Sequence, residues 1–171
     1  MDSQATILAS RFARIREMRE EIACLHKENL RLRGEAEAMQ CHFALALMAA
    51  VDLAVLPKDG LFIIVDGWNI ALGGRRRRTP KKIRDLARRY LEMHKRDFIW
   101  IVWDGPEEGG TQRDRLRMSW TGGTGKQRAD RLICDFIRMA NWRGQVKRIR
   151  LLTSDRELVE TAQRLIKQKT A

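Results

Sequence analysis

Four aspartates are candidates for catalytic or metal-binding residues. Asp66, Asp104 and Asp155 each follow a short apolar run, and Asp130 stands near the start of a helical pattern. Carboxylates brought together repel one another and raise each other's pKa unless a cation lies between them. Oxygen ligands favour Mg²⁺ or Mn²⁺ over zinc, and such ions promote phosphodiester hydrolysis. A single aspartate more often caps a helix or turn, whereas three strand-end acids together favour a site.

Apolar runs alternating with helical patterns are expected to position these acids. The predicted strands are 61–65, 98–103, 148–152 and a shorter one at 116–120, with a loop at 106–115. The predicted helices cover about 80–95, 127–141 and 156–167. This alternation predicts an α/β domain with a mostly parallel sheet covered on both faces. Carboxyl ends of parallel strands meet at one edge, so the acids are expected to converge there.

Residues 1–56 have a different pattern, with apolar side chains at ten of the twelve a and d positions of a heptad repeat that starts at Leu8. This repeat predicts a coiled-coil helix, and Asn29 at an a position favours a parallel pair. The apolar segment 43–56 is expected to be buried, either in a helical bundle or on the α/β domain, with Asp52 facing water. Residues 57–60 mark the boundary between a helical dimerisation region, 1–56, and the domain 61–171.

The excess positive charge is confined to the second region. Residues 1–60 contain 8 basic and 9 acidic side chains, whereas residues 61–171 contain 26 and 13. A basic α/β domain suggests a polyanion such as nucleic acid as its partner, although a merely soluble surface is the simpler alternative. The candidate phosphate contacts are Arg75, Arg76, Arg77, Arg78, Lys81, Lys82, Lys126, Arg128 and Arg156.

Tryptophans beside the acids are candidates for stacking on unpaired bases. Trp68 is the stronger candidate, and for Trp120 stacking and core packing are equally plausible. Trp100 and Trp142 are expected in the core.

The cysteines and the amino terminus indicate a cytoplasmic protein. Three cysteines without CxxC spacing, and three histidines outside any ligand motif, predict neither a zinc site nor a disulfide framework. The amino terminus lacks signal-peptide features, and the longest apolar run is too short to cross a membrane.

Four short motifs resemble the NYN domains, which are nucleases of the PIN-like group. Val65-Asp66-Gly67-Trp68-Asn69 is similar to their opening D-G-Y-N, with Trp for Tyr, and Trp103-Asp104-Gly105 to their F-D-G. Ser119-Trp120-Thr121 with Ala129-Asp130-Arg131-Leu132-Ile133 resembles F-T…A-D-x-x-I, and Leu152-Thr153-Ser154-Asp155-Arg156 resembles V-T-S-D-R. The order and spacing are most similar to the YacP-like branch.

The resemblance implies a PIN-like Rossmannoid three-layer fold and a Mg²⁺- or Mn²⁺-dependent endoribonuclease. It implies Asp66, Asp104, Asp130 and Asp155 as metal ligands, with Asn69 positioning a ligand or the scissile phosphate. RNA is then the expected substrate, DNA less so, with a homodimer formed through the coiled coil. The coiled coil lies outside the family core, and the edge strand that often follows the last helix is not evident.

Two other functions remain open on the residues alone. One is a non-catalytic RNA-binding or adaptor protein assembled through the coiled coil. The other is an aspartate-nucleophile phosphatase, which is disfavoured because Asp66 is not followed by a second acid two residues on.

Overall fold

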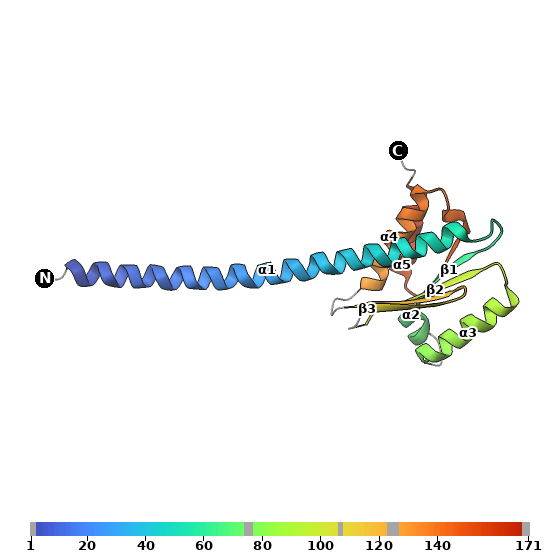
Figure 1. Cartoon of the computed structure of the whole chain (residues 1–171), viewed down its shortest axis with the longest axis horizontal. Helices are drawn as coiled ribbons and strands as arrows, with labels where there is room; N and C mark the ends of the chain where they lie inside the picture. Colours follow the sequence, from blue (N-terminus) through green and yellow to red (C-terminus); the bar gives the residue numbers. More distant parts are fainter. Residues whose placement is uncertain (1–2, 74–76, 106–107, 123–126, 169–171) are drawn as a thin grey trace. The chain divides into compact units, whose positions relative to one another are not determined.

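The structure is a computed structural model that describes residues 3–73, 77–105, 108–122 and 127–168 (Figure 1). The chain divides into two compact units, Met1–Met39 and Gln40–Ala171. Helix α1 (Ser3–Val55) begins in the first unit and ends in the second. The compact unit that contains the sheet therefore begins before residues 57–60, where the sequence indicates a boundary.

The second unit is built on a five-stranded sheet with the order β3-β4-β2-β1-β5. Its parallel strands are β1 (Phe62–Asp66), β2 (Phe98–Trp103), β4 (Leu116–Thr121) and β5 (Ile149–Leu152). Strand β3 (Glu108–Arg113) pairs antiparallel with β4 at one edge. The central strands β1 and β2 are buried along their whole length, as continuous apolar runs predict. The expected α/β domain with a mostly parallel sheet is confirmed.

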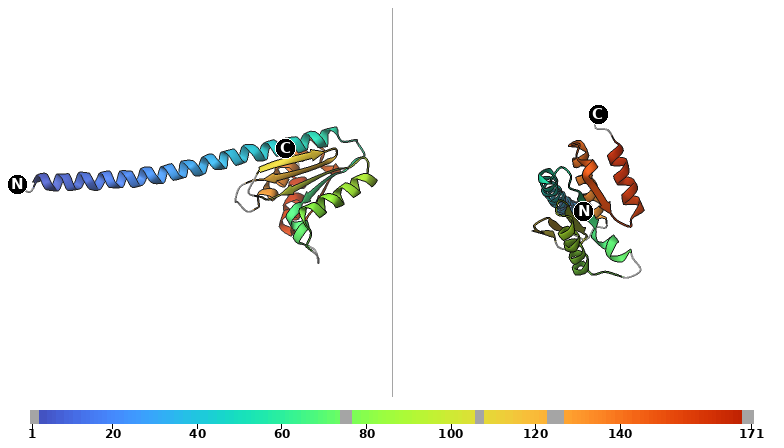
Figure 2. Two further views of the ribbon diagram at one scale, coloured as in Figure 1. Left: turned by 60° about the horizontal axis from the view of Figure 1, so that its bottom comes forward. Right: turned by 90° about the vertical axis from the view of Figure 1, so that its right-hand side faces the viewer.

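Helices cover both faces of this sheet (Figures 1 and 2). The end of α1, α4 (Arg128–Trp142) and α5 (Arg156–Lys167) pack on one face, and α3 (Pro80–Met93) packs on the other beside the short α2 (Gly67–Leu72). Successive strand residues point to opposite faces, so each strand supplies both cores. In β1, Phe62 and Ile64 join the first core, while Ile63 and Val65 join the second.

Capping residues account for the agreement between the predicted and observed helix starts. The Thr79 hydroxyl accepts a hydrogen bond from the backbone N–H of Lys82, and Pro80 occupies the first helical position of α3. Asp155 caps α5 in the same way. Helices α3 and α5 consequently begin at the residues that the sequence indicates.

Three elements were not predicted, namely β3, α2 and the short 3-10 helix η1 (Val146–Arg148) before β5. The assignment of 106–115 to a loop is wrong for β3, whose Gly109 and Gly110 give it no strand signal. Pairing with β4 stabilises β3 in spite of this low propensity. Helix α2 has six residues, which is too short to show a helical period.

The end of α1 docks on the sheet, which is one of the two placements that the sequence allows for 43–56. Ala46, Ala49 and Leu53 are almost fully buried in the first core. The expectation that Asp52 faces water is wrong, because its side chain is buried and lies 2.6 Å from Nε of Arg117 on β4. Gln112 of β3 also donates to the Asp52 carboxylate. The partner comes from 65 residues away, so no local pattern in the sequence shows it.

Strand β5 forms the other edge of the sheet, and only β1 pairs with it among the described residues. The Arg150 side chain folds back along this edge and donates to the carbonyl oxygens of Ile149 and Lys147, at 2.9 and 3.3 Å. Leu152, at the end of the strand, is about half exposed.

In the first unit, the described a and d side chains lie in solvent. Met18, Ile22, Leu25, Leu32 and Met39 are all more than half exposed. This apolar stripe has no cover within the described chain. No helix in the described part is long and apolar enough to cross a membrane.

Candidate functional site

Three of the four aspartates stand at one edge of the sheet, where the parallel strands end. Asp66 is the last residue of β1, and Asp104 follows directly on β2. The register pairs Asp66 with Val102 on β2, and Val65 with Leu152 on β5. Asp155 follows β5 by three residues and begins α5. Parallel pairing therefore brings together acids that are far apart in the sequence.

Asp66 is almost fully buried, and two other side chains hold its carboxylate in place. Its Oδ2 accepts hydrogen bonds from Asn69 Nδ2 at 2.6 Å and from Thr153 Oγ1 at 2.8 Å. The backbone N–H of Asn69 lies 3.4 Å from Oδ1, so Asp66 also caps α2. These hydrogen bonds give the buried carboxylate the polar partners that it would otherwise lack away from water. The sequence singled out Asn69 but gave no role to Thr153.

Backbone and hydroxyl donors also hold Asp104 and Asp155. Asp104 Oδ1 accepts from the backbone N–H of Ala129 at 2.7 Å and from Thr121 Oγ1 at 3.0 Å. Asp155 Oδ1 accepts from the backbone N–H groups of Glu157 and Leu158 at the start of α5. In both residues the second carboxylate oxygen makes no hydrogen bond within the described chain. Each acid thus has a fixed orientation and an oxygen left for a ligand.

Asp130 lies in the first turn of α4, where the charges of the other acids affect its pKa. Its pKa is raised to about 6, first by burial and then by the negative charges of Asp66, Asp155, Asp104 and Glu157. Asp130 and Asp155 line one pocket, Asp104 accepts from the N–H of Ala129 beside Asp130, and Thr153 bonds to both Asp66 and the backbone of Asp155. Glu157 was missed, because it lies inside α5 and reads as an ordinary acidic residue of a first helical turn.

The donor set suits a hard divalent cation. All the candidate ligand atoms are carboxylate oxygens, and the repulsion that adds to burial in raising the pKa of Asp130 is of the kind that a cation relieves. Among the described residues, no three Asp, Glu, His or Cys side chains stand close enough to hold one ion together. Mg²⁺ is commonly held by one or two carboxylates and several waters, and this acid set can provide such partial ligation.

A pocket of about 350 Å³ opens beside these acids between α4 and α5. Asp130, Asp155 and Glu157 line it on the acid side, and Arg131 and Arg138 contribute cations. This mixture of charges distinguishes the pocket from the more basic surface on the α3 side of the sheet.

The tryptophans differ in exposure. Trp68 is 40% exposed, and its indole N–H donates to the Asp104 carbonyl oxygen while its ring stands edge-to-face on the buried Trp103. Its orientation is therefore fixed across the ends of β1 and β2. Trp120 is half buried against the second core, and Trp100 is fully buried as expected. The expectation that Trp142 is in the core is wrong, because it is the last residue of α4 and is 71% exposed.

The described basic candidates are mostly exposed side chains. Arg77, Arg78, Lys81, Lys82 and Arg156 are exposed, and Arg128 is half buried at the start of α4. Arg78, just before the start of α3, donates to the carbonyl oxygen of Ile70 at 3.4 Å, which ties this residue to α2. Arg75, Arg76 and Lys126 lie outside the described residues.

A scan against protein-family models and searches of curated proteins and of solved structures found no match to this chain.

Proposed function

We propose that this protein is a Mg²⁺- or Mn²⁺-dependent endoribonuclease of the NYN type, with a PIN-like fold. The observation that carries the proposal is the position of Asp66, Asp104 and Asp155 at the ends of three neighbouring parallel strands, with Asp130 in the first turn of α4 lining one pocket with Asp155. Four acids at the carboxyl edge of a parallel sheet, within a basic domain, suit metal-assisted hydrolysis of a phosphodiester.

In this proposal the acids would bind the metal ion, and neighbouring donors would hold the acids in place. Asp66, Asp104, Asp130 and Asp155 would hold the ion, which when bound activates water and stabilises charge on the phosphate. Asn69 and Thr153 fix the orientation of the Asp66 carboxylate, and Thr121 with the Ala129 N–H fixes that of Asp104.

RNA is the proposed substrate, with DNA a poorer one. The net charge of +13 over residues 61–171 favours a polyanion, and the exposed ring of Trp68 beside the acids can stack on an unpaired base. Exposed arginines and Lys81 near α3 would contact phosphates, which position a strand without reading its sequence.

The test is cleavage of labelled RNA, and of matched DNA, by the full chain. Mg²⁺ or Mn²⁺ is expected to support cleavage, and a chelator is expected to abolish it. Asp104→Asn and Asp130→Asn are expected to lower the rate by at least about 100-fold, because each removes a ligand charge. Asp59→Asn is the matched control, since Asp59 lies before β1 at the opposite edge and is paired with Arg96 at the surface.

Circular dichroism of each variant separates lost chemistry from lost fold. Cleavage that persists in chelator, or full activity in folded Asp104→Asn, would contradict the proposal. Faster cleavage of DNA than of RNA would contradict the substrate class alone.

One observation favours the non-catalytic alternative, an RNA-binding adaptor. Both oxygens of Asp66 already accept hydrogen bonds, and no three acids in the described chain are close enough to chelate one ion. RNA binding that is unaffected by metal, with no cleavage of single-stranded or structured RNA, would favour this function.

The proposed assembly is a homodimer formed through the heptad stripe of α1, whose described apolar side chains are exposed. The cytoplasm is the proposed location, because the three cysteines have no CxxC spacing and no disulfide framework is predicted from them.

A further inference from the structure

A pocket lined by cations lies at the other end of the sheet from the acids. A pocket of about 360 Å³ is formed where α3 ends and β4 begins. Four cations, Arg88, Lys95, Arg113 and Arg115, line it together with the two acids Glu92 and Asp114. The parallel strands β2 and β4 both start beside this pocket, and both end at the edge of the sheet where Asp104 lies. The pocket thus lies about one strand length, roughly 20 Å, from the acid edge.

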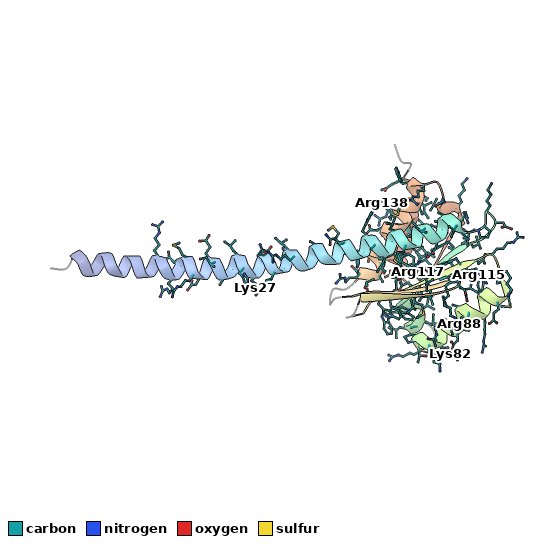
Figure 3. All side chains as sticks on the ribbon, in the orientation of Figure 1. Lys27, Lys82, Arg88, Arg115, Arg117 and Arg138 are labelled. Carbon is teal, nitrogen blue, oxygen red and sulfur yellow. The ribbon has the colours of Figure 1, made fainter. Side chains whose placement is uncertain are left out.

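Arg115 makes this pocket suitable for an anion. Its guanidinium donates to the carbonyl oxygens of Leu91, His94 and Asp97, at 2.8 to 2.9 Å. The carbonyls of Leu91, in the last turn of α3, and of its C-cap His94 belong to the negative end of this helix, which would otherwise repel a phosphate. Because Arg115 covers them, Arg88, Lys95 and Arg113 remain for a ligand, and these three side chains make no hydrogen bond or ion pair within the described chain. Figure 3 shows Arg88 on α3 and Arg115 beside it.

A strip of the β3–β4 hairpin connects this pocket to the acid edge. The register places Gly109, Thr111 and Arg113 of β3 opposite Trp120, Met118 and Leu116 of β4, on the face that α3 shares. We call Gly109, Thr111, Arg113, Met118 and Trp120 the hairpin strip. Trp120 and Met118 are half buried, whereas Thr111 and Arg113 are exposed. A Cβ placed on Gly109 would meet no atom within 4 Å, so the surface next to Trp120 is open.

We infer that the hairpin strip binds the part of a nucleic-acid strand that extends away from the acid site, and that the Arg88–Lys95–Arg113 pocket holds a phosphate at its far end. This inference rests on the proposed function, since it extends the path of that substrate. Trp120 offers a ring for stacking near the acids, the glycine leaves room for a base, and the cations neutralise the backbone. A stacked strand advances about 3.4 Å per nucleotide, so the pocket contacts a phosphate roughly six nucleotides from the acids.

The test is binding of labelled RNA by fluorescence anisotropy, in chelator so that no cleavage occurs. Oligonucleotides of about 4 and about 12 nucleotides are compared, because only the longer reaches both ends of the strip. The wild-type chain is expected to bind the longer strand far more tightly. In Arg88→Glu and Arg113→Glu this gain is expected to fall roughly tenfold, and the salt dependence to flatten by about 0.7 per lost phosphate contact.

Arg164→Glu is the matched control, because it makes the same charge change on α5, in the opposite layer. Arg113→Gln, which removes the charge without reversing it, is expected to show a smaller loss of the same kind. An unchanged length dependence in folded Arg88→Glu and Arg113→Glu overturns the inference, as does an equal loss in Arg164→Glu. Binding of inorganic tripolyphosphate that depends on Arg113, together with RNA binding that Arg113→Glu leaves unchanged, also overturns it, because the pocket would then serve a free anion.

The two proposals fail separately. Absence of metal-dependent cleavage with the length dependence intact contradicts the nuclease and retains the strip. Cleavage that depends on Asp104 but not on strand length contradicts only the strip.

Discussion

Asp130 is the residue whose pKa reflects both burial and the neighbouring acids. In the metal-free protein its pKa is about 6, against 3.8 for an ordinary aspartate, because burial and neighbouring carboxylates oppose its ionisation. Between these values the folded chain binds more protons at this site than the unfolded chain. The stability that this protonation contributes is therefore lost as the pH rises from about 4 to about 6.

Asp130→Asn is expected to stabilise the metal-free protein at pH 7 by about 1 kcal/mol, after allowance for solvent screening. The neutral side chain removes the repulsion but keeps the shape. Urea unfolding in chelator, measured at several pH values, tests this, and the advantage of Asn is expected to shrink as the pH falls from 7 to 4. A variant less stable than wild type at pH 7, or an advantage that grows on acidification, contradicts the crowding argument.

At the scale of elements, the Asp52–Arg117 pair fixes the end of α1 to the sheet. Both side chains are more than 90% buried, and Gln112 forms a hydrogen bond with each of them. If one partner were removed, water could not solvate the charge of the other. Breaking a buried pair costs more than the pair itself contributes, since one charge is left without a partner.

Arg117→Met alone is expected to lower the free energy of unfolding by about 3 kcal/mol. Combining it with Asp52→Leu is expected to recover most of this loss, because no unpaired charge then remains. Arg138→Met, which breaks an exposed pair with Asp135, is expected to cost less than about 1 kcal/mol. Denaturant unfolding of the four proteins provides the comparison, and equal losses in Arg117→Met and Arg138→Met would show that the buried pair has no special weight.

The same elements show what the sequence can and cannot predict. Buried runs such as β1 and β2, and capped helices such as α3 and α5, carry their signals locally and were predicted correctly. Strand β3 depends on its partner β4, and the position of Asp52 depends on Arg117, so neither has a local signal. In the candidate site the strand-end acids were visible in the sequence. The donors that orient them, Thr121 and Thr153, depend on register between strands and were not.

For the whole molecule, the exposed stripe of α1 leads to a prediction about assembly. The full chain is expected to be a dimer, and the double substitution Ile22→Glu and Leu25→Glu is expected to make it monomeric, since like charges would then face each other in the seam. Lys27→Glu, on the outer side of the heptad, is the control. Sedimentation equilibrium measures the mass of each protein.

A monomeric wild-type chain at micromolar concentration would contradict the coiled-coil interpretation.

Asn29→Val is expected to strengthen association and to admit higher oligomers, because a buried asparagine selects the two-stranded state at a cost in stability.

The β5 edge has a consequence for how the molecule behaves when crowded. An open strand edge is a template on which a second chain can add its own strand, and a sheet extended in this way leads to aggregation. Here Arg150 occupies the carbonyl oxygens of Ile149 and Lys147 with its own guanidinium and puts a positive charge along the edge. Two copies that approach by this edge repel each other, and two of the carbonyl oxygens with which an added strand could pair already accept hydrogen bonds from Arg150. A single side chain thus protects the sheet where no further strand in the described chain covers it.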